Sequence, residues 1–316
     1  MKKTFSVLAC IMALFLCVSG ASAANWPAKN ITVLVPLAAG GNTDGLARGL
    51  IVPALEKAFG VKALVKNVPG GALTLGAAEV ANSKPDGYTL MVAPLGPVVL
   101  QTQLRTLPYG KDAFAPIYFI ANSPSFLIAT KDVPSSFDAM IADAKANPGK
   151  YVYGSTGPGT VPHINLIALC KQYGVEMKHV PDRSGAEVMK SMASGTTHFF
   201  ADAGMYIPRY DLQGLVIFSD ERHPDFPNIP SAKEIGSDQR FSVWNALYAP
   251  AGTPAEILDK IYDACKDLSK DPEAQKFVSG MGAHFIDMTR AEFTDFVNAE
   301  YDKFGGIIKE AGIKLE

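Results

Sequence analysis

Short apolar runs alternate with helical patterns along most of this 316-residue chain, and no other feature constrains its fold as strongly. The runs ITVLVP, YTLMVAP, YVYGS and HFFADA are bounded by Gly, Pro, Asn or Asp, as strands are. Apolar spacing between such runs predicts helices over 43–58, 72–81, 136–146, 163–173 and 185–194. This rhythm predicts an α/β fold with mostly parallel sheets flanked by helices. The length favours two domains.

The last sixty residues differ because almost all of them have helical patterns. TPAE, from Thr253 to Glu256, and TRAE, from Thr289 to Glu292, both read as capping boxes. We therefore expect a capped helix to begin at each of them.

The first 24 residues have the pattern of an export signal. Lys2 and Lys3 precede the apolar run FSVLACIMALFLCV, and ASA at 21–23 fits a cleavage site. A lipidated Cys17 is the alternative. The apolar run is short for a membrane span. We expect residues 1–24 to be removed and the protein to reside in the periplasm.

Residues 25–316 contain 27 basic and 31 acidic residues, which gives a net charge of −4. A mildly acidic exported chain is a poor candidate for binding nucleic acid. Cys170 and Cys265 follow the signal, both in helix-like patterns. We expect two buried free thiols, with a disulfide between them as the alternative.

One strand, glycine turn and helix pattern occurs at ITVLVPLAAGGNTDGLARGL. Gly40 and Gly45 have P-loop spacing, but Leu46 and Ala47 stand where a P-loop has Lys and Ser or Thr. The turn also lacks the G-x-G-x-x-G pattern of dinucleotide sites. A neutral turn at a helix start, lined by main-chain amides, suits a carboxylate better than a polyphosphate.

YVYGSTGPGTVPHINLIAL repeats that pattern more than a hundred residues later, and its hydroxyl groups come from Ser155, Thr156 and Thr160. The two turns could face each other across a cleft and hold an anion that draws two domains together. They could equally be ordinary connections between strand and helix.

Signatures of catalysis and metal binding are sparse. The chain has no G-x-S-x-G, H-E-x-x-H or C-x-x-C motif, and its five histidines lack metal-ligand spacing. We therefore expect no catalytic residues, no metal and no cofactor.

The order of VPLAAGGNTDGLAR, VKNVPGGALTLGAAEVANSKPDGYTLMVA, LPYGKDAFAPI, AKANPGKYVYGSTGPGTVPH, HVPDRSG and LYAPAGTPAEI resembles the TctC or Bug family over residues 26–313. These are periplasmic solute-binding proteins of tripartite tricarboxylate transporters. The resemblance implies a two-domain, type II Venus flytrap. Domain 1 would comprise residues 25–124 and 247–316, and domain 2 residues 125–246.

The resemblance also implies a function. A monomeric receptor would capture a small carboxylate, such as a di- or tricarboxylate, an acidic amino acid or an aromatic acid, and deliver it to integral membrane permease subunits. A ligand sensor for a signalling receptor and an enzyme on a similar scaffold are the alternatives.

By the same resemblance, ligand-binding residues come from both glycine turns. They are Ala39, Gly40, Gly41, Asn42, Thr43, Ser155, Thr156, Gly157, Thr160 and His163. Asp44 and Arg48 match the family pattern as well. We expect them to pair with each other rather than to touch the ligand, because Asp44 would repel a carboxylate.

Two segments depart from the family pattern. VPDRSG places Asp182 where the family has an aromatic residue, and PLGPVV makes the loop around Leu95 and Gly96 apolar. Arg183 is a candidate clamp for a distal carboxylate, with an Asp182 or solvent partner as the alternative. Asp202, after a strand, is a further cleft candidate.

Overall fold

The computed structural model describes residues 25–312, which surround one mixed sheet. Its nine strands run in the order β2-β1-β3-β9-β4-β7-β5-β6, and β8 pairs with β4. The strands are β1 (Ile31–Val35), β2 (Ala63–Asn67), β3 (Thr89–Pro94), β4 (Phe114–Ala129), β5 (Val152–Ser155), β6 (Lys178–Pro181), β7 (Phe199–Ala203), β8 (Gln213–Ile217) and β9 (Ser242–Pro250). The predicted signal peptide lies outside the described residues.

The first lobe is built on β2, β1 and β3, which are parallel, and on the paired parts of β9 and β4, which are antiparallel. One continuous helical run follows β1, with a π-helical turn in its middle. The helical segments of this lobe are α2 (Asn42–Leu46), η2 (Ala47–Ile51), α3 (Val52–Phe59), η3 (Gly71–Leu73), α4 (Thr74–Ala81), η4 (Gly96–Leu100), α5 (Gln101–Leu104), η5 (Lys111–Ala113), α10 (Ala255–Cys265), η6 (Leu268–Lys270), α11 (Pro272–Gly280) and α12 (Arg290–Ala311).

The second lobe repeats this plan. Strands β6, β5 and β7 are parallel, and the end of β4 pairs antiparallel with β7 and β8. Its helices are α6 (Phe137–Ala146), α7 (Val161–Tyr173), α8 (Gly185–Ala193) and α9 (Tyr206–Arg209). The predicted α/β class is therefore confirmed, and the sheet is mixed, with parallel strands at both ends of the strand order and antiparallel pairing where the lobes join.

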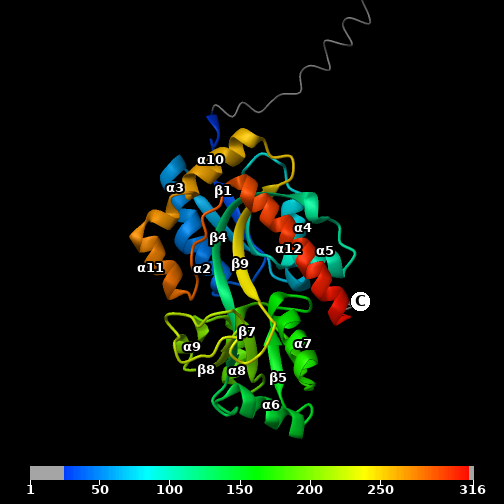
Figure 1. The fold of residues 1–316 in the computed structure, drawn as a ribbon. Helices are drawn as coiled ribbons and strands as arrows, with labels where there is room; N and C mark the ends of the chain where they lie inside the picture. The colour runs from blue at the N-terminus through cyan, green and yellow to red at the C-terminus, as the bar shows by residue number, and fades with distance from the viewer. Residues whose placement is uncertain (1–24, 313–316) are drawn as a thin grey trace, which may run out of the picture.

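Strands β4 and β9 run from one lobe to the other (Figure 1). Strand β4 pairs with β9 as far as Pro124 and with β7 from Ser125 onward, while β9 begins at Ser242. Two extended segments therefore connect the lobes. The domain boundaries at 124 and 246 that the family resemblance implies remain a prediction.

The sheet is buried on both faces. In β1, Leu34 packs into the cluster on one face, while Val33 and Val35 pack into the cluster on the other. This alternation reflects the two-residue period of a strand. The C-terminal helix is tied to the sheet where Trp244 Nε1 donates to the Glu300 carboxylate at 3.0 Å.

One of the two predicted capping boxes is confirmed. Thr289 caps α12, and its hydroxyl and main-chain amide exchange hydrogen bonds with Glu292. The other prediction is wrong, because Pro254 is extended and stands outside α10, which begins at Ala255. The Thr253 hydroxyl instead donates to the Pro250 carbonyl at 2.8 Å.

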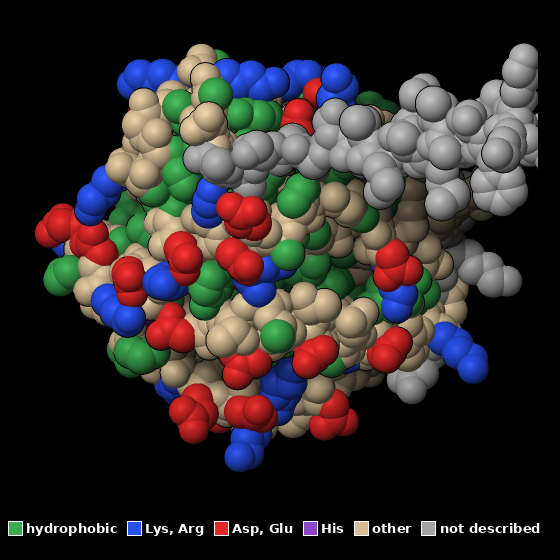
Figure 2. Space-filling view, turned by 90° about the horizontal axis from the view of Figure 1, so that it is seen from above, with side chains coloured by type: hydrophobic (Ala, Val, Ile, Leu, Met, Phe, Trp, Pro, Cys, Tyr) green, Lys and Arg blue, Asp and Glu red, His purple; other side chains and the backbone are tan. Residues whose placement is uncertain are grey.

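Charged side chains of both signs are interspersed on the face seen from above (Figure 2). Many charges pair locally along helices, as Lys266 does with Asp263 at 2.7 Å. Among residues 25–312, no helix is long and apolar enough to cross a membrane. Cys265 is buried, Cys170 is partly buried, and neither is in a disulfide.

Candidate functional site

A small cavity of about 30 Å³ lies on the seam between the lobes. It faces the carboxyl ends of β1, β3, β5, β6 and β7, where ligands of open α/β sheets bind. The volume holds about two water molecules. The lining residues are Leu37, Gly41, Asn42, Thr43, Leu73, Pro94, Gly96, Thr156, Thr160, Val161, Pro162, Ser184, Gly185, Asp202, Tyr206 and Val243.

Three helices begin at this cavity. Gly41 precedes α2, Thr160 precedes α7 and Ser184 precedes α8, and all three residues line the cavity. Each helix start presents main-chain N–H groups and roughly half a positive charge. The cavity is therefore favourable for an anion although no Lys, Arg or His is among the described residues that line it.

Asn42 is the most informative side chain of the cavity wall. It is 6% exposed, and neither its side-chain oxygen nor its nitrogen has a hydrogen-bond partner among the described residues. An unpaired buried amide costs about 1–3 kcal/mol. Its neighbour Thr43 differs, because the Thr43 hydroxyl donates to Asn245 Oδ1 at 2.7 Å. Asn42 is therefore available to a ligand, whereas the Thr43 hydroxyl is already committed.

Asp202 places a carboxyl group on the opposite side of the seam. It lies in β7, is 7% exposed, and accepts a 2.7 Å hydrogen bond from the Ala203 amide through Oδ1. Burial raises the pKa of Asp202 to about 7. The cavity therefore holds an acid that changes charge near neutral pH.

Tyr206 completes this wall, and the sequence alone did not single it out. A Cβ atom on Gly185 would lie 2.2 Å from the Tyr206 hydroxyl oxygen, so only glycine leaves room for that hydroxyl at the start of α8. Burial raises the pKa of Tyr206 far above its usual value, and the hydroxyl remains a hydrogen-bond donor.

Seven of the fourteen residues expected from the sequence lie together around this cavity. They are Gly41, Asn42, Thr43, Gly96, Thr156, Thr160 and Asp202. The other seven are not among its lining residues: Ala39 and Gly40 are exposed, Leu95, Ser155, Gly157 and His163 are buried, and Arg183 is exposed.

Ser155 and His163 support the second glycine turn from behind. The Ser155 hydroxyl lies 2.6 Å from His179 Nε2, and the Gly159 amide donates to His163 Nδ1 at 2.9 Å. The His163 and His179 rings stack with centroids 4.1 Å apart. Ser155 and His179 resemble a nucleophile and its base, a pair that the sequence did not identify. Ser155 is fully buried, however, and it also bonds to Gly157.

Asp44 holds the first glycine turn, and its predicted pairing with Arg48 is confirmed. Arg48 Nε lies 3.0 Å from Asp44 Oδ1, while Asp44 also accepts from the Gly40 amide and from Asn67. Burial alone would raise the pKa of Asp44, but these bonds outweigh it and the pKa is lowered.

Arg183 and Asp182 bond to different partners. The Arg183 guanidinium pairs with Glu187 at 2.9 Å and is 70% exposed, and Asp182 accepts a bond from Ser191. Glu187 and Ser184 flank the start of α8 in an S-x-x-E pattern, and Ser184 caps the helix. That capping signal was readable in the sequence and could have pointed to Ser184 and Gly185.

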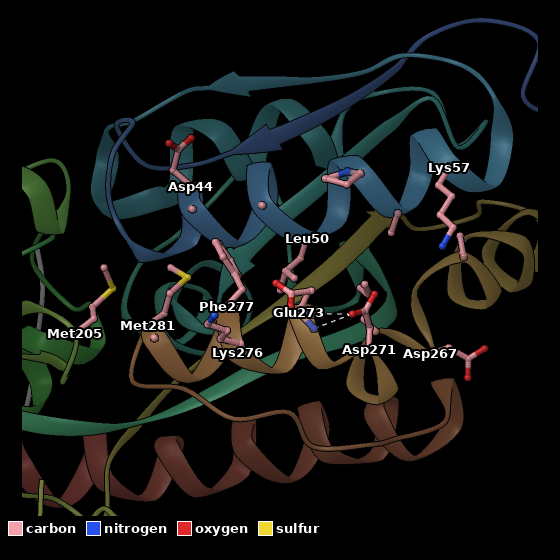
Figure 3. A pocket seen from close by; sticks show the side chains of 18 of the residues that line it. Asp44, Leu50, Lys57, Met205, Asp267, Asp271, Glu273, Lys276, Phe277 and Met281 are labelled. Carbon is pink, nitrogen blue, oxygen red and sulfur yellow. Dashed lines mark hydrogen bonds between the residues drawn. The ribbon is translucent and has the colours of Figure 1, made fainter. Parts of the chain in front are cut away.

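A second hollow is larger but differs in character. It is an open groove of about 1430 Å³ between the 42–59 helical run and α11. Phe277 of α11 and Met281, which directly follows α11, point toward that run, and Met205 approaches from the second lobe (Figure 3). The Phe277 ring packs so closely that a Cβ on Gly49 would lie 2.3 Å from it. Of the three helix starts that face the small cavity, only that of α2, at Gly41, also borders the groove.

The described residues contain no cluster of three or more His, Cys, Asp or Glu side chains that could hold a metal ion.

Comparison with known proteins shows the family to which the chain belongs. The family model described as "Tripartite tricarboxylate transporter family receptor" (TctC) matches residues 47–313. The chain belongs to the TctC family.

Relatives of this TctC chain agree with that assignment. A UPF0065 protein of Bordetella pertussis is 30% identical, with 99% of each chain covered. Rpa4515 of R. palustris, solved with adipate, has a TM-score of 0.86 and 26% identity, with 92% of this chain and 99% of its own covered. MatC (Rpa3494) from Rhodopseudomonas palustris, solved with malate, has a TM-score of 0.84 and 26% identity, with 90% of this chain and 100% of MatC covered. The two-lobed fold is therefore that of periplasmic solute-binding proteins.

Proposed function

We propose that this chain captures a small carboxylate between its two lobes and delivers it to a tripartite tricarboxylate-type membrane transporter. The observation that carries this proposal is the meeting of three helix starts with the unpartnered Asn42 amide at one inter-lobe cavity. Helix starts favour an anion, and an unpaired amide favours a ligand with hydrogen-bonding oxygens.

The energetics are adequate for such a role. Charge-assisted hydrogen bonds contribute about 1.5–3 kcal/mol each, and micromolar affinity requires about 8 kcal/mol. Several amides at the starts of α2, α7 and α8 can therefore hold a carboxylate without a lysine. Adipate and malate in two relatives support the same ligand class.

The small cavity also bears on how the ligand enters. About 30 Å³ holds water but not a dicarboxylate, so the lobes must separate to admit one. Strands β4 and β9 connect the lobes and are the elements about which such a movement would occur. We propose that the protein works as a periplasmic monomer whose closed form is presented to the permease subunits.

A thermal-shift screen tests the proposal. The purified protein is heated with mono-, di- and tricarboxylates, amino acids and aromatic acids, and each hit is measured by calorimetry. We expect at least one acid to raise the melting temperature. If no acid does so and a nucleotide or sugar binds tightly instead, the carboxylate proposal is wrong.

An enzyme is the competing class, and the Ser155–His179 pair is the feature to test. Ser155 is buried and is not among the lining residues, so we expect no turnover of a bound acid. Chemical analysis of the acid after prolonged incubation measures this. Loss of the acid in wild type but not in Ser155→Ala would overturn the binding-protein assignment.

A further inference from the structure

The cavity contains one carboxyl group and no cationic side chain. Asp202 is its sole Asp or Glu, and no Lys, Arg or His is among the described residues that line it. An anionic ligand would therefore meet a second negative charge in a site whose polar side chains are largely buried from bulk solvent. Two carboxyl groups in one such site do not both ionise; they share a proton.

From this arrangement we infer that the ligand carboxylate enters together with one proton, which it shares with Asp202 in the closed site. The inference rests on the proposed function, because it requires a carboxylate ligand. The inference explains how a site that contains Asp202 can bind a second carboxyl group.

The hydrogen bonds of Asp202 leave one oxygen for this purpose. Oδ1 accepts from the Ala203 amide at 2.7 Å. Oδ2 can therefore carry the proton and donate to an oxygen of the ligand. In this step the site, with Asp202 ionised, takes up one ligand carboxylate and one proton from solvent. The proton is then shared between the two carboxyl groups. No covalent bond between heavy atoms changes.

No cation is among the described residues that line the cavity with Asp202, and Arg105 and Arg183 line a neighbouring hollow instead. Tyr206 from α9 is the titratable neighbour on the wall, and Asn42 from the 42–59 run is neutral. The residue opposite Asp202 in β4 is Phe126, against which His223 packs. The positive charge of Arg209 opposes the rise that burial causes in the pKa of Tyr206, whereas the pKa of Asp202 is shifted by burial and by the Ala203 amide.

The helix starts can compensate for the charge of the ligand carboxylate but not also for that of an ionised Asp202. Each contributes roughly half a positive charge, and the effect weakens within the first turn. Three of them can balance the ligand carboxylate. The carboxyl of Asp202 is already partly protonated near neutral pH because its pKa is about 7. A second acid close by favours the protonated form further.

Calorimetry of the wild-type protein tests this directly. Malate and adipate are titrated at pH 8 in two buffers that differ in ionisation enthalpy, since the difference in observed heat gives the protons taken up. Both ligands are fully ionised at that pH. We expect about one proton per bound acid, and affinity that falls about tenfold between pH 8 and pH 9. Binding without proton uptake overturns the inference and leaves the proposed function intact.

Two variants identify the group that takes up the proton. Asp202→Asn keeps the shape and a donor, so we expect it to bind the acid without proton uptake and without the pH dependence. Asp182→Asn is the matched control, because Asp182 is a partly buried carboxyl outside the cavity; it should retain the uptake. Circular dichroism checks that both variants fold. The measurement of proton uptake by the wild-type protein does not depend on either variant.

Other results separate the alternatives. If an amino acid binds without proton uptake and Asp202→Asn abolishes its binding, Asp202 is an ionised acceptor for an ammonium group and the inference is wrong. If none of the acids in the thermal-shift screen binds, the proposed function itself fails and the inference falls with it.

Discussion

The side-chain amide of Gln101 in α5 donates to the main-chain oxygen of Pro158, 3.1 Å away, across the seam between the lobes. Arg105 donates to the same oxygen at 3.3 Å. Gln101 belongs to the first lobe and Pro158 to the second glycine turn, so both bonds form only when the lobes are together. They stabilise the closed form and hence the bound state.

Replacing Gln101 with Ala is expected to weaken carboxylate binding about fivefold, because one hydrogen bond contributes about 1 kcal/mol. The weaker binding should appear as faster dissociation in stopped-flow measurements. Gln103→Ala is the control on the same helix, since Gln103 bonds to Val99 and Tyr301 within the first lobe. An equal loss of affinity in both variants would contradict the closing role of Gln101.

Asn42→Ala separates ligand binding from stability. Its side-chain amide has no partner within residues 25–312, so we expect carboxylate binding at least tenfold weaker while the melting temperature without ligand stays the same or rises. Calorimetry and thermal unfolding measure the two effects. Unchanged affinity in a folded variant would remove Asn42 from the site.

Thr43→Val is the matched comparison and should behave in the opposite way. It leaves Asn245 without its 2.7 Å partner inside the fold. We expect the free energy of unfolding to fall by about 1–2 kcal/mol and the affinity to stay within about twofold. Urea unfolding and calorimetry measure the two quantities, and a large loss of affinity with normal stability would contradict this prediction.

Local patterns predicted most elements but not the longest strand. The sequence reads as two strands, FAPIYFIA and SFLIATK, with a break near Pro124. The structure has one strand, β4, because its two prolines fall where pairing is already irregular. Pro116 lies at a register shift against β9, and Pro124 lies where the partner changes from β9 to β7. A proline removes one donor, and only the pairing of distant strands shows whether that donor is needed.

Only some of the residues that line the cavity could be predicted from the sequence, for a similar reason. Both glycine turns contribute lining residues, and their strand-turn-helix patterns are local. Tyr206 reaches the cavity through contact with Gly185, which is distant in sequence. The Ser155–His179 contact likewise depends on β5 lying beside β6. No spacing within one segment encodes such contacts, because sheet order decides them.

Arg183→Ala tests the clamp suggested by the sequence. The guanidinium is tied to Glu187, and Arg183 lines a neighbouring hollow of about 290 Å³ rather than the cavity. Because exposed ion pairs contribute little, we expect carboxylate affinity to stay within about twofold and stability to change by less than about 1 kcal/mol. Arg105→Ala, which removes a bond across the seam, should weaken binding more. A tenfold loss for Arg183→Ala in calorimetry would restore it as a ligand clamp.

The stacked histidines behind the second glycine turn make stability depend on pH. Burial is the main cause that lowers the pKa of His163 to about 3 and that of His179 to about 4. In the unfolded chain both return to about 6.5. The unfolded state therefore binds more protons below pH 6.5, and stability is lost as the pH falls from there toward about 3.

His163→Phe removes one of these imidazoles and keeps an aromatic ring in the stack. The Gly159 amide loses its 2.9 Å acceptor, so the variant is expected to be less stable than wild type at pH 7. The fall in unfolding free energy between pH 7 and pH 5 should nevertheless shrink by up to about 2 kcal/mol, because one fewer proton is taken up on unfolding. Urea titrations of both proteins at the two pH values measure this difference. If the fall is the same in both proteins, His163 is not a group that couples folding to pH.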